Sequence, residues 1–160
     1  MDSKGSGDFI SLREALVAGT HDTPSTIIVL NGSYTLRRGW PDVKVQSFQI
    51  VGGGNVDVTG DIKSKRCALL NATGADTSIF LENLKISFIS NSSEPRHCVA
   101  VLGGASARVT RCEMRSTAAA CYSDGKGSSL LLLSCRTTGP GAGPLVINSG
   151  FLVASDFHFS

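Results

Sequence analysis

The stretch Leu81-Glu-Asn-Leu84-Lys-Ile86 recurs three times, in altered form, toward the end of the chain. Its counterparts follow at steps of 28, 23 and 22 residues, and the first step is lengthened by an insertion at residues 91–95. A near-constant period between about 20 and 50 residues is typical of repeat architectures. The counterparts are Val109-Thr-Arg-Cys112-Glu-Met114, Leu132-Leu-Ser-Cys135-Arg-Thr137 and Ala154-Ser-Asp-Phe157-His-Phe159.

A second set of segments keeps nearly the same period, with steps of 31, 23 and 24 residues. A repeat of this length that holds two or three short strands between Gly, Ser and Asn turns is typical of a parallel β-helix. The alternative is a jelly roll or an immunoglobulin-like sandwich, which would not be expected to keep two registered columns. The second set comprises Cys67-Ala-Leu-Leu70, Cys98-Val-Ala-Val101, Cys121-Tyr-Ser-Asp124 and Leu145-Val-Ile-Asn148.

We therefore predict an all-β fold, a right-handed parallel β-helix of about five to six coils that forms one domain over residues 1–160. Residues 1–25 are predicted to form an N-terminal cap segment with a helix at about 11–18, and residues 26–160 to form the coils. Ser11 is the expected N-cap of this helix and Glu14 completes a capping box. Gly19 is placed to end it. Its apolar face should lie on the first coil, since a helix this short is marginal alone in water.

The composition indicates one compact domain and argues against several classes of partner. The 160 residues are 41% hydrophobic and 18% charged, with 18 glycines and a net charge of +2. Beyond Arg37-Arg38 there is no basic cluster, so we expect no nucleic-acid binding. The apolar runs are too short to cross a bilayer, so no membrane insertion is expected. No cofactor is predicted.

All five cysteines fall within the two columns, which indicates a packing role. Free cysteine behaves as a small buried hydrophobe, so we interpret these residues as a core ladder. Disulfides are the alternative in an oxidising compartment, since adjacent coils would bring paired cysteines within bonding range. No metal site is expected, because there is no C-x-x-C pair or His/Cys cluster. The ladder consists of Cys67, Cys98 and Cys121 in one column and Cys112 and Cys135 in the other.

The compartment is not determined, although an intracellular location is favoured by the odd number of cysteines and by a first stretch without a signal sequence. Three N-glycosylation sequons, at Asn31, Asn71 and Asn91, point the other way if the chain enters the secretory route. We interpret these three sequences first as parts of turns, because turns are rich in Asn, Ser and Thr.

Several segments resemble pectin methylesterases and, more broadly, the pectate-lyase-like superfamily. The likeness covers roughly the first 135 residues and consists of β-helix building elements, so it implies the fold more firmly than an activity. The segments are Lys4-Gly-Ser-Gly-Asp-Phe9 with Ser11-Leu-Arg-Glu-Ala-Leu16, Ile27-Ile-Val-Leu-Asn-Gly-Ser-Tyr34, Phe48-Gln-Ile-Val-Gly-Gly-Gly54, and His97-Cys-Val-Ala-Val101 with the strand from Ala107 to Met114.

The catalytic residues that this resemblance implies are missing. The family's first Gln is replaced by His97, and Ser116-Thr-Ala-Ala-Ala120 stands where a Gln and an Asp are expected. The segment from Thr137 to Pro144 lacks the second carboxylate, so the nucleophile and the general acid/base are both absent. A Ca²⁺-dependent lyase site is missing too, since Asp124 is a lone turn residue. His97 and Asp124, the remaining titratable candidates, are not expected to converge.

We therefore expect a non-catalytic β-helix that is a structural or protein-interaction subunit of a larger assembly. The expected docking surface is an uncapped C-terminal coil with Phe157, His158 and Phe159, because the chain stops inside a predicted strand. The alternative function is carbohydrate binding or a residual pectin-esterase-like activity. For carbohydrate, Trp40 is the candidate stacking residue, although packing under the helix is the favoured interpretation of this side chain.

Overall fold

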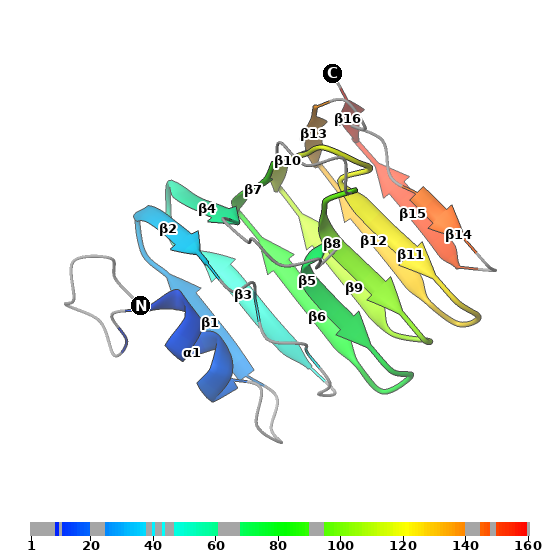
Figure 1. The fold of residues 1–160 in the computed structure, drawn as a ribbon, viewed down its shortest axis with the longest axis horizontal. Coiled ribbons are helices and arrows are strands. Elements are labelled where there is room, and N and C mark those ends of the chain that lie inside the picture. The colour runs from blue at the N-terminus through cyan, green and yellow to red at the C-terminus, as the bar shows by residue number, and fades with distance from the viewer. Residues whose placement is uncertain are drawn as a thin grey trace.

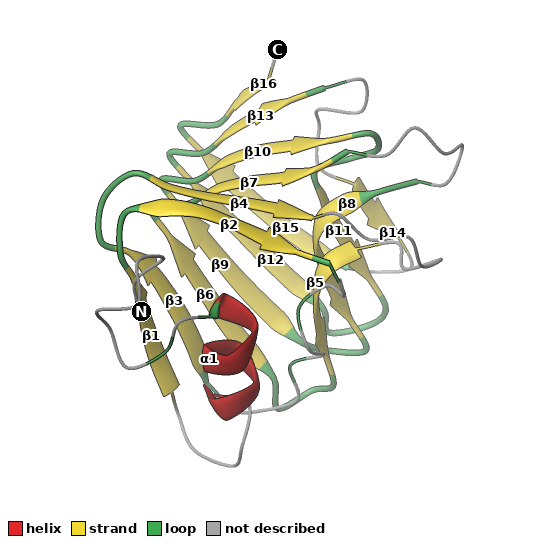
Figure 2. Cartoon of the chain, turned by 60° about the vertical axis from the view of Figure 1, so that its left-hand side comes forward, coloured by secondary structure: helices red, strands yellow, loops and turns green. Residues whose placement is uncertain are grey.

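Three parallel β-sheets wind into one solenoid, with a short helix at one end and the last strands of the chain at the other (Figure 1). The computed structural model describes residues 9, 11–19, 25–37, 40, 43, 47–60, 68–89, 95–139, 145–147 and 150–159. The chain passes repeatedly from sheet A to sheet B to sheet C, and each turn lies on the one before it (Figure 2). The all-β, parallel β-helix prediction is therefore confirmed.

Sheets A and B contain six strands each, and sheet C contains four. In sheet A the order is β1 (Ser25–Val29), β3 (Phe48–Gly52), β6 (Ser78–Glu82), β9 (Ser106–Thr110), β12 (Ser129–Leu133) and β15 (Phe151–Ser155). In sheet B it is β2 (Gly32–Leu36), β4 (Val56–Gly60), β7 (Lys85–Phe88), β10 (Glu113–Ser116), β13 (Arg136–Thr138) and β16 (His158–Phe159). In sheet C it is β5 (Ala68–Thr73), β8 (His97–Leu102), β11 (Cys121–Asp124) and β14 (Leu145–Ile147).

The solenoid has about four turns that include a strand of every sheet, fewer than the five to six coils expected. The difference arises in sheet C, where the described part of the chain has no full strand beside β5 on its N-terminal side. There, Val43 forms a single parallel bridge with Ala72, and the Trp40 N–H donates to the Leu69 carbonyl. As far as the described residues show, the first turns are held by sheets A and B and by these contacts of Trp40 and Val43.

The helix α1 (Leu12–Gly19) begins after Ser11, as the sequence predicts. The Glu14 backbone N–H lies 3.4 Å from the Ser11 hydroxyl oxygen, the contact made by an N-cap residue. The apolar face packs on the first strands β1 and β2, where Leu12, Ala15 and Leu16 are buried. The helix therefore covers the N-terminal end of the core.

The first predicted column is confirmed residue by residue. Leu81 pairs with Val109, Val109 with Leu132, and Leu132 with Ala154. In the interior, large apolar side chains from all three sheets form one continuous core. It includes Trp40, Phe48, Ile50, Leu69, Leu81, Phe88 and Met114.

The register predicted for the second column is wrong. Cys121 pairs with Val99 and not with Cys98, and Leu145 pairs with Tyr122. The cause is local: the N–H groups of both Cys98 and Val99 donate to the Ala120 carbonyl, so two residues of β8 oppose one residue before β11. Such a bulge shifts the later pairs of β8 with β11 by one position. It does not account for the other two steps of the column, in which Leu70 pairs with Val99 and not with Val101, and Leu145 with Tyr122 and not with Cys121.

Candidate functional site

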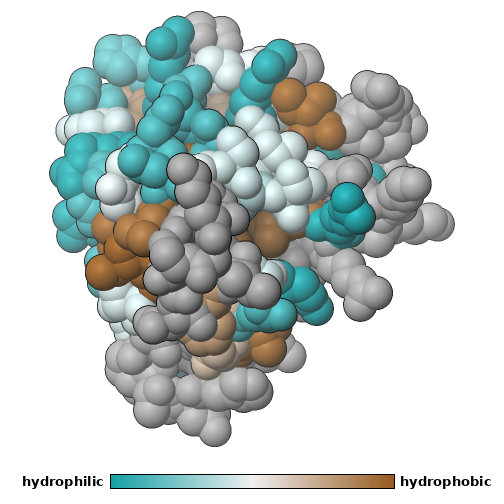
Figure 3. Space-filling model, turned by 90° about the vertical axis from the view of Figure 1, so that its left-hand side faces the viewer, coloured by the Kyte–Doolittle hydropathy of each residue, from teal (hydrophilic) through white to brown (hydrophobic). Residues whose placement is uncertain are grey.

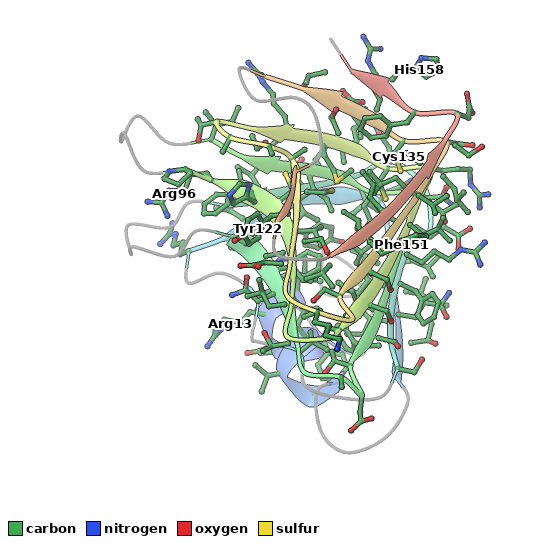
Figure 4. All side chains as sticks on the ribbon, turned by 90° about the vertical axis from the view of Figure 1, so that its right-hand side faces the viewer. Arg13, Arg96, Tyr122, Cys135, Phe151 and His158 are labelled. Carbon is green, nitrogen blue, oxygen red and sulfur yellow. The ribbon has the colours of Figure 1, made fainter. Side chains whose placement is uncertain are left out.

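The C-terminal end of the solenoid is the described surface with the most exposed apolar side chains on one strand. Among the described strands, β15 forms the edge of sheet A there and pairs with β12. Phe151 is 63% exposed and Val153 is 41% exposed. Figure 4 faces this end and shows Phe151 on the outermost strand. An edge strand with exposed apolar side chains is a template for pairing with another chain.

Residues alternate between the two faces of β15, as in any strand. Leu152 points to the interior, where it packs against the core. Phe151 and Val153 lie on the outer face, beside the outward, half-buried Leu131 of β12, which pairs with Val153. Leu133 is half-buried on the same face. We call Leu131, Leu133, Phe151 and Val153 the terminal patch.

The three residues predicted to face a partner have different environments. Phe157 is half-buried and packs against the core. Its side chain therefore covers the interior, and only part of it is accessible to a partner. The His158 side chain is 75% exposed and its Nε2 lies 3.3 Å from a carboxylate oxygen of Asp156. Phe159 belongs to β16, and its side chain lies outside the described residues. Phe151 and Val153 were missed, although the strand period of two places them outward once Ala154 is assigned to the interior column.

The opposite end of the solenoid differs, because α1 packs against it. Figure 3 faces that end, and on its described surface hydrophilic side chains predominate at the upper left, with smaller apolar areas between. Ile28, on the outer face of β1, is 56% exposed there. It is therefore a useful reference for an exposed apolar side chain away from the terminal patch.

The described cysteines are core residues with free thiols, and Cys67 lies outside the described residues. Burial raises the pKa of Cys98 and of Cys112 to about 12, and it raises the pKa of Cys121 and Cys135 as well. The Cys121 Sγ lies 3.4 Å from the Met114 Sδ. Such protonated, enclosed thiols are poor nucleophiles.

Tyr122 contacts both His97 and Asp124, the two titratable candidates of the sequence. The His97 ring stacks on the Tyr122 ring at 5.1 Å between centroids, and the Tyr122 hydroxyl donates to Asp124 Oδ2 at 2.9 Å. The His97 Nδ1 lies 2.5 Å from the Ala119 carbonyl oxygen, which requires this nitrogen to be protonated.

The Trp40 ring is not available for stacking on a sugar. It is 1% exposed and belongs to the core cluster that also contains Leu12 and Leu16 of the helix. Its burial agrees with the prediction that the ring packs inside the protein. A different aromatic ring, Phe80 of β6, is half-buried on the outer face of sheet A and pairs with Arg108.

Phe80 and Arg108 line a hollow of about 300 Å³. Arg111 also lines it, and its guanidinium group contacts the carboxylate of Glu82 and donates to Asn83 Oδ1 at 2.9 Å. An aromatic ring beside a cation and hydrogen-bonding groups is a combination that can contact a sugar. This hollow was not recognised in the sequence because its residues come from three different turns.

Within the described residues, no three His, Cys, Asp or Glu side chains converge as metal ligands would. In the same part of the chain, no helix has the length and apolar character needed to cross a bilayer. The Asn31 side chain links two successive turns of the solenoid, since its Oδ1 accepts the Asn55 N–H at 2.7 Å. Asn91 lies outside the described residues.

Comparisons with protein families, with curated proteins and with solved structures find no match to this chain.

Proposed function

We propose that this chain is a non-catalytic β-helix of the pectate-lyase-like type, and that it serves as a structural or protein-interaction subunit. In this proposal the partner docks at the C-terminal end of the solenoid. The observation that carries the proposal is the exposed edge of β15, with Phe151 and Val153 on its surface.

Two forces favour a protein partner there. Burial of an exposed apolar side chain contributes roughly 25 cal/mol per Å² of apolar area removed from water. An added strand would also satisfy backbone groups along the edge, which is how sheets recruit extended segments of other proteins. At the other end, α1 already buries Leu12, Ala15 and Leu16 against the first strands. The two ends are therefore chemically different.

The non-catalytic part of the proposal is supported by the chemistry of the candidate groups. The described thiols are held protonated by burial. The His97 imidazole is occupied by a backbone carbonyl and an aromatic ring. The carboxylates that the pectin methylesterase resemblance calls for are replaced by small or polar residues in the sequence.

The test compares two variants that each add one charge on the outer face of sheet A. Phe151→Lys lies in the terminal patch, and Ile28→Lys lies at the far end. The tagged chain should capture a protein from its native source that also forms a stoichiometric complex with it when both are purified. We expect Ile28→Lys to keep this complex and Phe151→Lys to lose it. A complex that tolerates Phe151→Lys equally well would refute docking at this end.

Carbohydrate binding is the second candidate, and the Phe80 hollow is the observation that favours it. Arg108, which pairs with Phe80, is exposed at its rim. Titration calorimetry with neutral and acidic oligosaccharides tests this candidate directly. Binding that Phe80→Ala abolishes and Ile28→Ala preserves would support it, and an absence of heat with both sugar classes would exclude it. A residual esterase remains the weaker alternative, and pectin demethylation assays address it.

A further inference from the structure

We propose that the partner of the β15 edge is a second copy of this chain, paired antiparallel across a two-fold axis at Val153. This inference rests on the proposed docking function and specifies its partner. It follows from the hydrogen-bonding direction of β15, from the sizes of its side chains and from the difference between the two ends of the solenoid.

The backbone groups of β15 that face outward can be assigned from its pairing with β12. The Phe151 N–H donates to the Ser128 carbonyl at 2.8 Å, and the Ser155 carbonyl accepts the Ser134 N–H at 2.9 Å. Odd-numbered residues of β15 therefore direct their backbone groups toward β12. Because this direction alternates along a strand, Leu152 and Ala154 direct their N–H and C=O groups to the free edge.

A two-fold axis at Val153 uses these free groups fully. In that register, Leu152 of one copy lies opposite Ala154 of the other, and each pair exchanges two N–H···O=C bonds. Val153 then faces its own counterpart as a non-hydrogen-bonded pair, with side chains closer together than in a bonded pair. The register also overlaps all five residues of β15, the most that the strand allows.

The side chains of β15 are complementary in size to the same strand reversed. The large Phe151 faces the small Ser155, and Leu152 faces Ala154 in the joined interior. No residue of β15 is charged, so the two-fold pairing brings no like charges together. On the outer face, the terminal patches of the two copies become neighbours on one continuous sheet. A strand with a charged residue at its centre, or with large side chains at both ends, would not be complementary to its own reversed copy.

The geometry also limits the assembly to two copies. An isologous contact uses the same surface on both molecules and leaves no second copy of that surface free. The other end of the solenoid is covered by α1, as Figure 1 shows, so it does not present the same edge. We therefore expect a closed dimer rather than a filament.

The test uses the purified full chain in sedimentation and light-scattering measurements over concentrations from about 1 to 100 μM. We expect a mass twice that of the chain, Val153→Lys to give a monomer, and Ile28→Lys to leave the dimer unchanged. Thermal unfolding of both variants, followed by circular dichroism, checks that each is folded. A wild-type chain that is monomeric throughout, or a dimer that tolerates Val153→Lys, overturns the proposal.

Cysteine cross-linking tests the register independently of any loss of folding. Val153→Cys should form an intermolecular disulfide under mild oxidation, since the two Cα atoms would lie about 4.5 Å apart. Phe151→Cys should not, because its counterpart would be four residues, or about 14 Å, away along the strand. Equal cross-linking of both variants, or none by Val153→Cys, contradicts the two-fold axis. If the chain is monomeric, the dimer proposal fails, but the proposed docking function is still tested by the capture of a different protein.

Discussion

Glu113 of β10 lies directly opposite Arg136 of β13 in the parallel ladder of sheet B. On its other side Glu113 faces Lys85 of β7, which in turn faces Asp57 of β4. Acid and base therefore alternate over four successive turns, about one strand spacing apart. Opposite charges in register on neighbouring strands stabilise their pairing, and like charges oppose it. This column favours the observed register of sheet B.

Reversal of the central charge should destabilise the solenoid. We expect Glu113→Lys to place a third cation between Lys85 and Arg136 and to lower the free energy of unfolding by roughly 1 kcal/mol. Urea unfolding at low ionic strength measures the loss. In about 1 M NaCl the loss should shrink, because salt screens exposed charges.

The matched control is the next outward position on the same strand. Arg115 faces the uncharged Ser87 and Thr138, so Arg115→Glu should change the free energy of unfolding by less than about 0.5 kcal/mol. Equal losses for the two reversals would show that the charge column does not contribute.

Two adjacent glycines should respond differently to a methyl group. A Cβ at Gly52 would lie 2.1 Å from the backbone oxygen of Asn83, whereas a Cβ at Gly53 would have its nearest neighbour, the Val29 oxygen, at 3.5 Å. We expect Gly52→Ala to cost roughly 2 to 3 kcal/mol in unfolding free energy, since the backbones of two turns must separate. Gly53→Ala should be nearly neutral. Chemical denaturation of both variants measures this, and a neutral Gly52→Ala would contradict the close approach.

The stability of the protein should fall at alkaline pH through the buried thiols. Their pKa is raised by burial, to about 12 for Cys98 and for Cys112, so an unfolded chain ionises first as the pH rises. The contribution of these thiols is therefore fully present below about pH 9 and is lost between about pH 9 and 12. Each thiol changes the unfolding equilibrium constant by at most about tenfold per pH unit.

Denaturant unfolding at stepped alkaline pH measures this slope. The double variant Cys98→Ala, Cys112→Ala is the control, and it should be less stable near neutral pH but lose stability less steeply above pH 9. The same slope in the variant and in the wild type would assign the alkaline loss to other groups.

The fluorescence of Trp40, the single tryptophan of the chain, should be insensitive to sugars. Because the ring is 1% exposed, we expect emission at short wavelength, weak quenching by iodide and no change when pectic oligosaccharides are added. Unfolding should shift the emission to longer wavelength. A saturable change with oligosaccharide would mean that the ring becomes accessible to the ligand.

The first column was predictable because its residues are alike in chemistry and recur at a regular spacing. Leu81, Val109 and Leu132 are large, apolar and followed three residues later by another interior residue. The corner between these positions is always one residue in the left-handed region, namely Asn83, Arg111, Ser134 or Asp156. Since these four turns use the same corner, the strands on both sides of it keep their register, and an alignment of the sequence segments gives that register directly.

The register predicted for the second column was wrong because the cysteines of successive segments were assumed to pair with one another in the sheet. Cys98 and Cys121 are both buried in the core, yet they belong to different positions of sheet C. The bulge at Cys98 and Val99 inserts one residue without changing the composition of the strand. A match of residue types cannot reveal it, because both positions of a bulge can point inward.

The candidate site was only partly accessible from the sequence. Docking at the C-terminal coil stays a prediction; of the residues named for it, Phe157 packs against the core, whereas Phe151 and Val153, which were not named, are exposed. The Phe80 hollow and the contact between His97 and Tyr122 were not predicted, because each joins residues more than twenty positions apart.

The sequence by itself determined the class of fold, the helix after Ser11 and the interior column from Leu81 to Ala154, since local turn chemistry and a regular period are written in neighbouring residues. The tertiary structure alone decided the register of sheet C, the burial of Trp40 and the exposure of Phe151. These depend on which turns lie against each other and on which side chains face the interior. Stacking between turns is a long-range relation, and a single bulge is enough to change it.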